Sequence, residues 1–493
     1  MGRIVVVSNR VPDPLKAAQA GGVAVALSDC LARRGGLWFG WSGAVVEGAP
    51  EDVPVAVEEN GVSRVIVPIT ESEYNGYYLG YSNSVLWPVF HNRVDLAQFE
   101  AGYFAIYSSV NERFADFLRC MLTDDDVIWV HDYHLIPLAQ KLRAMGVNNR
   151  IGFFLHIPFP PSQSFMTIPE HEQLAKAFSA YDLIGLQSTT DVAHMIDYLE
   201  HGASGQMLPD GRMRVAGREF SIASFPVGID VSYFARTAED AADEPQSGAR
   251  ARIVGVDRLD YTKGLPQKFR AYGHFLERHP EFRSRVVLTQ IAAPTRESVE
   301  AYSDIRKELE SLAGSINGAY GDLEWVPIHY INRTEPRERL AGIYRHSAVG
   351  LVTALRDGMN LVAKEFIAAQ DERDPGVLIL SRFAGAAEQL TDALLVNPYN
   401  VEDISEAIHM AVEMPLAERV RRHRALLSTI TRSDASHWSD SFLAQLEALD
   451  VSFHPGPDPN GNRRLRRAMK RLSRSGKFAR RTFEGSEDRS CSH

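Results

Sequence analysis

Short, β-rich apolar runs alternate with longer amphipathic runs along most of this chain. Such an alternation is typical of parallel strands that are joined by helices. In the first half the pattern predicts strands at 3–9, 126–132, 150–158 and 182–187, and helices at 20–36 and 135–146. In the second half it predicts one strand in each of the apolar runs 251–257, 284–292, 346–354, 376–381 and 393–397, the first of which would end at Val256. We therefore expect an α/β protein with two doubly wound domains in tandem, which bind ligands at the carboxyl ends of their sheets.

The pattern also indicates the domain boundaries. Residues 236–250 are acidic, small and polar and have no apolar period, which predicts a linker. It would join a first domain of residues 1–235 to a second domain of residues 251–435. We expect a last helix at 436–452 to pack back toward the first domain. Residues 40–90 are rich in Gly, Tyr and Trp and interrupt the alternation, so we interpret them as an insertion of loops and hairpins.

Composition narrows the class of protein. The 493 residues are too many for one ordinary core, and 45% hydrophobic with 24% charged residues is typical of soluble globular proteins. The formal net charge of −10 argues against nucleic acid as the main partner. The first apolar run is too short for a signal peptide, and no apolar stretch approaches the ~20 residues that span a bilayer. We therefore expect a cytoplasmic enzyme without membrane association.

The cysteines and the last segment add two expectations. Cys30, Cys120 and Cys491 are few, odd in number and far apart, which indicates a reducing compartment and no disulfide framework. We interpret the first two as ordinary helix residues. The tail at 453–493 is strongly basic and is typical of disordered, solvated appendages. Its alternatives are an arm for nucleic acid or an acidic surface, an amphipathic helix formed on a partner, and docking onto the acidic body.

Polar residues end the first predicted strand. Ser8, Asn9 and Arg10 stand at its carboxyl end, and Gly21 and Gly22 precede the next helix. Paired glycines before a helix let the backbone approach a phosphate closely. A full G-x-G-x-x-G motif is absent, so a simple tight turn explains the pattern equally well.

Two later strand ends carry histidines and a carboxylate. His131, Asp132 and His134 could form a metal site with His156, but neighbouring strand residues point to opposite faces, and no Cys or Glu completes a ligand pattern. We therefore predict no metal and interpret Asp132 and His156 as residues that bind ligand hydroxyls. A capping Asp and a structural His are the alternative. The acidic run at 123–127 imitates a metal-binding D-x-D motif, but it precedes a strand and is better explained as a helix-to-strand turn.

Three cations follow strands of the second domain. Arg258 and Lys263 lie five residues apart, after a strand predicted to end at Val256 and before a turn at Gly264, and Arg296 follows the next strand. A guanidinium fork and an ammonium group together suit a diphosphate. Each cation alone could belong to a surface salt bridge. Their common place at strand carboxyl ends favours a binding site.

The stretch LRDGMNLVAKE, residues 355–365, places carboxylates around a turn that leads from a strand into a helix. A helix that begins near Asn360 would offer free N–H groups and a partial positive charge to an anion. Yet Asp357 lies in the turn, and Glu365 falls in the second helical turn. A ligand of this stretch must therefore offer hydrogen-bond donors to a carboxylate and also an anionic group to the start of the helix.

Together these motifs resemble the bacterial trehalose-6-phosphate synthases. The similarity runs in order from about residue 3 to about residue 450 and does not cover the basic tail. The motifs that carry it are GGLWFGWSG, SNSVLWPVFH, VHDYHL, NNRIGFFLHIPFP, DRLDYTKGLPQKF, YGDLEWVPIHYIN and LRDGMNLVAKEF. The resemblance implies the GT-B fold, in which two Rossmann-like domains face each other across a cleft. It also implies a retaining glucosyltransferase that converts UDP-glucose and glucose 6-phosphate into α,α-trehalose 6-phosphate and UDP.

The resemblance further implies a role for each residue of the donor site. Arg258 and Lys263 would hold the donor diphosphate, and Asp357 would hold hydroxyls of the donor glucose. His156 would contact the same glucose, and Glu365 would bind the ribose. Such a ligand removes the conflict in the turn, because its hydroxyls lie at both ends and its phosphates in the middle. The backbone contacts would come from Gly22, Gly358, Met359, Asn360, Leu361 and Val362.

For the acceptor, the resemblance implies that Arg10, Tyr78 and Arg296 hold the 6-phosphate. Trp41, Trp87 and Asp132 would shape the acceptor site and bind the sugar. The residues expected to act in catalysis are Asp132, His156, Arg258, Lys263 and Asp357. No residue is an obvious covalent nucleophile, and the usual account for the family is front-face transfer, in which a donor phosphate oxygen helps to deprotonate the acceptor. No metal or other cofactor is implied, and we expect a homo-oligomer, either a dimer or a tetramer.

Three other functions stay open at this point. A related synthase could use another donor or acceptor, such as a glucosylglycerol-phosphate synthase that uses ADP-glucose. A catalytically silent sugar-phosphate sensor would be expected to lack one of Asp132, Arg258, Lys263 or Asp357, and all four are present. A nucleic-acid protein that binds through the tail is disfavoured by the acidic body.

Overall fold

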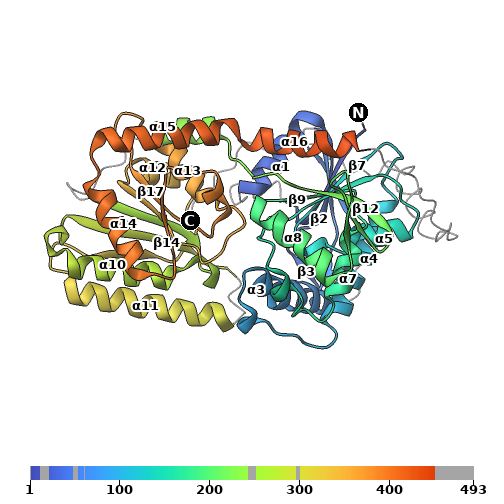
Figure 1. The fold of residues 1–493 in the computed structure, drawn as a ribbon, viewed down its shortest axis with the longest axis horizontal. Coiled ribbons are helices and arrows are strands. Elements are labelled where there is room, and N and C mark those ends of the chain that lie inside the picture. The colour runs from blue at the N-terminus through green and yellow to red at the C-terminus, as the bar shows by residue number, and fades with distance from the viewer. Residues whose placement is uncertain are drawn as a thin grey trace, which may run out of the picture.

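The computed structural model describes residues 2–11, 22–47, 54–59, 61–241, 251–295 and 300–449. Figure 1 shows two lobes, each built around its own sheet, with the last helices lying across the top of both. The expected tail at 453–493, most of the expected linker and Arg296 lie outside the described residues.

The first lobe contains a ten-stranded sheet. In spatial order its strands are β10 (Gln206–Met207), β11 (Met213–Val215), β12 (Arg218–Ser224), β9 (Leu183–Leu186), β8 (Arg150–Phe154), β7 (Val127–His131), β1 (Ile4–Arg10), β2 (Gly36–Trp41), β5 (Val62–Ile66) and β4 (Val55–Glu59). The strands from β12 to β5 are parallel, and the edges are antiparallel. A separate small sheet pairs β3 (Val45–Val46) with β6 (Ile69–Thr70).

The second lobe contains a six-stranded sheet that is parallel throughout. Its spatial order is β15 (Ile328–Ile331), β14 (Val286–Ala293), β13 (Ala251–Arg258), β16 (Val349–Val352), β17 (Val377–Ser381) and β18 (Leu394–Val396). The chain moves outward from β13 to β15 and then returns to β16, so the order reverses between β13 and β16. A doubly wound sheet binds ligands beside such a reversal, at the carboxyl ends of the strands. The loops after β13 and β16 both begin there.

Helices cover both faces of each sheet. Those of the first lobe are α1 (Gly22–Arg34), α2 (Glu71–Glu73), α3 (Trp87–Phe90), α4 (Tyr103–Arg119), α5 (Leu138–Ala144), α6 (Ser162–Phe165), α7 (His171–Phe178) and α8 (Thr189–Gly202). The later helices are α9 (Val231–Asp240), α10 (Leu265–Arg278), α11 (Glu300–Tyr320), α12 (Arg337–Arg345), α13 (Leu361–Ala369), α14 (Val401–Glu413), α15 (Leu416–Arg432) and α16 (Ala435–Ala448). In the described parts of the chain, no helix has the length and apolar character needed to cross a membrane.

Several expectations from the sequence can be checked against these elements. Residues 236–240, expected in the linker, continue α9, whose Phe234 and Ala238 are buried in the core of the second lobe. The acidic run at 123–127 leads from α4 into β7, as a turn. The strand predicted to end at Val256 continues to Arg258, because β13 pairs with β14 along its whole length.

The interpretation of residues 40–90 as loops and hairpins was partly wrong. The β4–β5 hairpin is present, but α2, a π-helix that we label η2 (Tyr74–Leu86) and α3 form one continuous helical segment. Gly and Tyr are weak helix formers, so the sequence pattern missed it. Asn83 and Ser84 donate side-chain hydrogen bonds to carbonyl oxygens five residues earlier, at 2.7 and 2.8 Å, which suits the wide π turn.

The last helix, α16, packs on the first lobe, as expected for residues 436–452 up to the described end at 449. The Phe442 ring stacks on Trp129 of β7, with ring centroids 4.9 Å apart. A Cβ at Gly152 or Gly185, in the two neighbouring strands, would lie 2.7 Å from the Phe442 ring. These glycines therefore leave the space that the helix fills, and Figure 1 shows α15 over the second lobe continuing into α16 over the first.

Candidate active site

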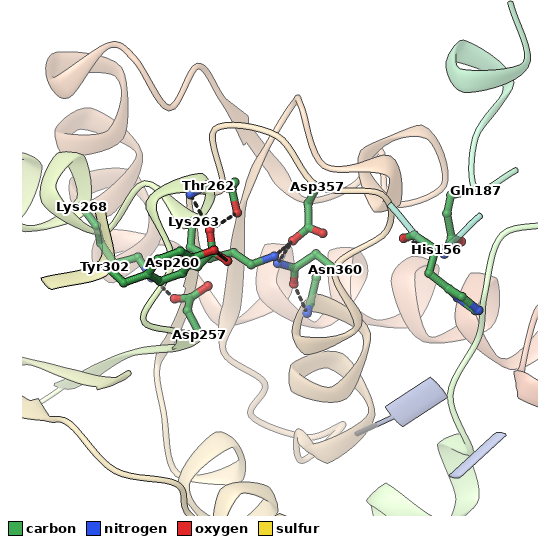
Figure 2. Close-up of polar contacts among 11 residues, drawn as sticks. His156, Gln187, Asp257, Asp260, Thr262, Lys263, Lys268, Tyr302, Asp357 and Asn360 are labelled. Carbon is green, nitrogen blue, oxygen red and sulfur yellow. Dashed lines mark hydrogen bonds and ion pairs between the residues drawn. The ribbon is translucent and has the colours of Figure 1, made fainter. Parts of the chain in front are cut away.

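The loop after β13 directs a lysine toward the loop after β16. Its turn at Gly264 has a φ of 65° and passes so close to β16 that a Cβ would lie 2.1 Å from the Thr353 carbonyl oxygen. The turn directs Lys263 toward Asp357, and Nζ lies 2.5 Å from Oδ2 (Figure 2). Only 10% and 14% of the two side chains are exposed, so this ion pair is largely removed from water.

Asn360 completes the surroundings of Asp357. Its Nδ2 donates to Asp357 Oδ2 at 3.1 Å, while its Oδ1 accepts from Ala363 N at 3.2 Å and caps α13. Burial acts to raise the pKa of Asp357, but the charge and hydrogen bond of Lys263, together with smaller effects of His91 and Asn360, outweigh burial, and the pKa lies below its ordinary value. The carboxylate is therefore ionised at neutral pH. Both hydrogen bonds go to Oδ2, so Oδ1 is the oxygen that a ligand hydroxyl would use.

The loop that carries Lys263 is held by buried groups beneath it. Asp260 accepts hydrogen bonds from Thr262 N at 3.0 Å, from Thr262 Oγ1 at 2.9 Å and from Tyr302 OH at 3.2 Å (Figure 2). Below the loop, Lys268 Nζ lies 2.8 Å from Asp257 Oδ2 in a buried ion pair. These contacts fix both ends of the loop and hence the direction of Lys263.

The loop after β16 also touches the first lobe. A Cβ at Gly358 would lie 2.3 Å from the His156 carbonyl oxygen, so only glycine allows this approach. The His156 ring lies 3.0 Å from His131, measured from Nε2 to Nδ1. Burial lowers the pKa of His156 to about 3 and that of His131 well below its ordinary value, so both rings are neutral. The backbone of His156 thus lies against the loop, while its neutral ring points away from Asp357 in Figure 2.

Asp132 follows β7 in an unusual conformation. Its φ is 76°, a region that side-chain-bearing residues rarely adopt and that is often found at functional sites. Its Oδ1 accepts from His156 N at 3.3 Å, and its own N–H donates to the Phe154 carbonyl oxygen at 2.8 Å. The predicted pair of Asp132 and His156 thus lies together, at the carboxyl ends of adjacent strands.

Arg258 meets the first lobe through Trp87. Its guanidinium carbon lies 5.2 Å from the centre of the Trp87 ring, a cation–π distance. Arg258 is otherwise exposed, so its N–H groups can reach a ligand. A predicted donor residue and a predicted acceptor residue therefore contact each other across the two lobes.

His91 is a site residue that the sequence reasoning missed. Its Nδ1 lies 2.7 Å from the Trp87 carbonyl oxygen. Burial lowers its pKa to about 3, and the ring lies close enough to Lys263 and Asp357 for both charges to influence that pKa. The spacing of four residues from Trp87, in WPVFH, was the available signal, because it places both side chains on one helix face.

Two of the predicted acceptor residues, Trp41 and Tyr78, lie beside Arg10. Its guanidinium carbon lies 4.4 Å from the Trp41 ring centre and 5.8 Å from that of Tyr78. Tyr78 comes from the π-helix and stacks on His134, with ring centroids 5.8 Å apart. Arg10 is exposed at the end of β1. The Trp41 and Tyr78 rings therefore support one side of its guanidinium, while its positive charge stays accessible to solvent. Of the other predicted residues, Gly22 is the first residue of α1.

Glu365 lies apart from this group, in the second turn of α13. The nearest cation is Arg337, whose Nη2 lies 3.9 Å from Oε1. Burial raises the pKa of Glu365 to about 7, and Arg337 only partly opposes it. The carboxyl is therefore only half ionised near neutral pH.

Glu365 makes stability depend on pH. A carboxyl whose pKa is raised by folding binds its proton more tightly in the folded state, so its contribution is largest at low pH and is lost as the pH rises through about 7. Glu365→Gln lacks this titration. We expect the melting temperature of the variant, relative to the unmodified protein, to rise by on the order of 3 °C between pH 5 and pH 8. Differential scanning calorimetry at the two pH values measures this difference. A difference in melting temperature that is the same at both pH values would contradict the assignment.

A second contact joins the lobes beside the site. The Glu388 carboxylate of the second lobe accepts hydrogen bonds from the N–H and hydroxyl groups of Thr189 and Thr190, at 2.6–3.1 Å. These threonines begin α8 in the first lobe, where a negative charge is favoured by the helix dipole. Nearby, Arg356 Nη2 donates to the Phe159 carbonyl oxygen at 3.0 Å. Because Arg356 precedes Asp357, these contacts tie the Asp357 loop to the first lobe.

Comparisons with known proteins agree with this geometry. The family model described as Glycosyltransferase family 20 matches residues 7–448. The chain is 46% identical over 454 residues to a trehalose-6-phosphate synthase of Citrobacter koseri, with 91% of this chain and 95% of the relative covered.

Two solved structures are similar over most of this chain. One is an α,α-trehalose-phosphate synthase (UDP-forming) of Burkholderia xenovorans in complex with glucose 6-phosphate, with a TM-score of 0.87, 44% identity, and 91% and 100% of the two chains covered. The other, from E. coli, is bound with UDP-2-fluoro glucose and has a TM-score of 0.87, 43% identity, and coverage of 92% and 100%.

Proposed function

The chain belongs to glycosyltransferase family 20, and we propose that it transfers glucose from UDP-glucose to glucose 6-phosphate with retention of configuration, giving α,α-trehalose 6-phosphate and UDP. The observation that carries the proposal is the junction of the lobes, where the Lys263–Asp357 pair lies beside a loop whose Gly358 approaches the His156 carbonyl, and where Arg258 contacts Trp87. The relatives bound to glucose 6-phosphate and to a UDP-sugar support both substrates.

The donor would lie along the loops after β13 and β16. An ammonium group has three N–H donors, so Lys263 can keep its bond to Asp357 while it donates to a diphosphate oxygen. Arg258 would bind the same diphosphate, and the N-terminus of α13 would add its N–H groups. Asp357 Oδ1 would accept from a hydroxyl of the glucose. Glu365, one turn further along α13, would take the ribose.

The acceptor would lie on the first lobe. Arg10, held against Trp41 and Tyr78, is placed to bind the 6-phosphate. Asp132 and the neutral ring of His156 offer hydrogen-bond partners to sugar hydroxyls near the donor glucose. The contact between Arg258 and Trp87 brings the two substrates' sites together, which a direct transfer requires.

Charge stabilisation would supply most of the catalysis. As the glycosidic bond breaks, negative charge develops on the leaving UDP, and Arg258, Lys263 and the start of α13 face that charge. A donor phosphate oxygen would accept the proton of the attacking hydroxyl on the same face of the sugar, which retains the configuration. Contact between the lobes would exclude water, which competes as an acceptor. We propose that the reaction needs no metal or other cofactor.

The proposed function is tested by a matrix of substrates. Purified protein is incubated with UDP-, ADP- or GDP-glucose against glucose 6-phosphate or glycerol 3-phosphate, with and without EDTA. We expect UDP release and α,α-trehalose 6-phosphate, identified by NMR, at a rate that EDTA leaves unchanged. Preference for ADP-glucose and glycerol 3-phosphate would favour the related synthase. If no pair of substrates released a nucleoside diphosphate, the protein would not be a glycosyltransferase. The dimeric or tetrameric state and the cytoplasmic location stay predictions. Light scattering of the purified protein tests the oligomeric state.

The Glu388 contact provides a test of closure between the lobes. Glu388→Gln removes the charge that accepts hydrogen bonds from Thr189 and Thr190. We expect kcat/KM to fall about fivefold, since an exposed charged contact contributes roughly 1 kcal/mol. The dissociation constant of UDP should change less than twofold, because the side chains proposed to bind UDP, namely Arg258, Lys263 and Glu365, all belong to the second lobe. The matched control is the exposed Glu372→Gln; an unchanged kcat/KM, or an equal loss of UDP affinity, would exclude this role.

A further inference from the structure

The far end of α10 brings a histidine against two side chains of α14. His279 directly follows α10, while Glu406 and His409 lie three residues apart on α14 and hence on one helix face. Figure 1 shows α10 and α14 beside each other in the second lobe, and the two helices pack together. Within the described ranges, these three residues form a group of His, Cys, Asp or Glu side chains whose ligand atoms all lie within 4.8 Å of one another.

Packing holds the two imidazoles face to face. The ring centroids of His279 and His409 are 4.0 Å apart and the planes differ by 14°. Phe275 lies 5.5 Å from the His279 ring and Phe282 lies 5.8 Å from the His409 ring, so an aromatic wall supports both. Glu406, the third member of the group, is exposed. The stack therefore places both imidazoles next to the Glu406 carboxylate.

A second carboxylate stands beside the same group. Glu281 Oε1 lies 3.4 Å from His279 Nδ1. Metal-binding histidines commonly have such a carboxylate partner, which fixes the tautomer and the direction of the ring. Glu281 can therefore orient His279 toward an ion.

We propose that His279, Glu406 and His409 bind a divalent transition-metal ion of the Zn²⁺, Co²⁺ or Ni²⁺ class. Two imidazoles and a carboxylate suit these ions, whereas Mg²⁺ and Ca²⁺ prefer oxygen ligands throughout. In a tetrahedral zinc site the ligand atoms lie about 3.4 Å apart. For the three groups to reach that spacing, Glu406 would change rotamer and the two imidazoles would turn out of their stack, because the in-plane lone pairs of parallel rings do not converge on one ion. Water would fill the fourth position.

The site lies far from the proposed reaction. The helix α10 has 14 residues and begins just after Lys263, so its length places His279 roughly 21 Å from the start of the helix. A metal ion there would join the end of α10 to α14 and stabilise the second lobe. It would take no part in glucose transfer, so turnover should be the same with and without the ion.

Metal titration of the full chain tests the proposal. Protein is treated with EDTA, dialysed and titrated with CoCl₂ or ZnCl₂, using calorimetry and the visible absorption of Co²⁺. We expect one ion per chain with a dissociation constant of order micromolar, and a rise in melting temperature of on the order of 2 °C. MgCl₂ should produce neither effect.

Variants assign the ion to these residues. His279→Gln and His409→Gln should weaken Co²⁺ and Zn²⁺ binding at least about tenfold, as loss of a ligand does. Glu406→Gln, on an exposed residue, should weaken binding without any effect on folding. The control His437→Gln, an exposed histidine of α16, should bind as the unmodified protein does. Absence of stoichiometric binding, or unchanged affinity in both histidine variants, would overturn the proposal.

Discussion

An Asp357→Ala enzyme is expected to lose roughly 30-fold or more in kcat/KM, which corresponds to about 2 kcal/mol of transition-state binding. The substitution removes the acceptor for the donor sugar hydroxyl. It also leaves the Lys263 ammonium without its partner at 2.5 Å, in a place where little water can replace it. Initial-rate kinetics with both substrates varied would measure the loss.

The matched control for this substitution is Asp210→Ala. Asp210 is exposed and its carboxylate bonds to Arg212 at 2.7 Å, at a distance from the site. We expect its kcat/KM to stay within a factor of two of the unmodified enzyme. Near-normal turnover of Asp357→Ala would show that the carboxylate does not bind the donor sugar in the transition state.

Removing the Arg258 guanidinium should have a still larger effect on turnover. In Arg258→Ala, only one of the two cations that stabilise the negative charge on the leaving UDP remains. Removal of such a preorganised partner lowers kcat by a factor of roughly 10²–10³. The cation–π contact with Trp87, at 5.2 Å, is lost as well, so the lobes meet less firmly. Stopped assays that separate UDP release from donor binding would show a loss in kcat that exceeds the change in KM.

Two further variants make this second prediction specific. Arg258→Lys keeps the charge but not the fork of N–H donors, so we expect it to recover only part of the rate. Arg270→Ala removes an exposed arginine of α10 that pairs with Glu308, and its turnover should be unchanged. Equal kcat for Arg258→Ala and Arg270→Ala would rule out a role for Arg258 in stabilising the leaving group.

The hydrophobic pattern of the sequence predicted most strands of the second lobe, but not their order. Five apolar runs predicted five of its six strands, because a strand buried on both faces must be apolar throughout. The missing one, β15, reads IHYI and has polar or exposed positions at the sheet edge. The pattern also could not give the order of the strands, since order depends on contacts between residues far apart in the chain.

The sequence likewise predicted some residues of the candidate site and missed others. Lys263, Asp357 and Asn360 could be placed together because glycines and polar residues follow predicted strands, and strand ends meet at one edge of a sheet. His91 and Glu388 could not, since each reaches the site through a contact between lobes that no local period encodes. For Gly22 and Arg296 the sequence pattern indicated only a phosphate-binding place, and the specific roles come from the resemblance; Arg296 lies outside the described residues.

The position of α16 affects the order in which the chain can fold. Trp438 and Phe442 fill a space against Trp129 and Phe154 in the middle of the first sheet. During synthesis the residues of that sheet leave the ribosome first, and its last strand ends at Ser224, whereas the helix that covers it begins only at Ala435. The lobe that begins folding first therefore keeps an uncovered apolar face until nearly the whole chain exists. Newly made chains would depend on chaperones during that interval, and a fragment that ends before α16 would expose the same face permanently.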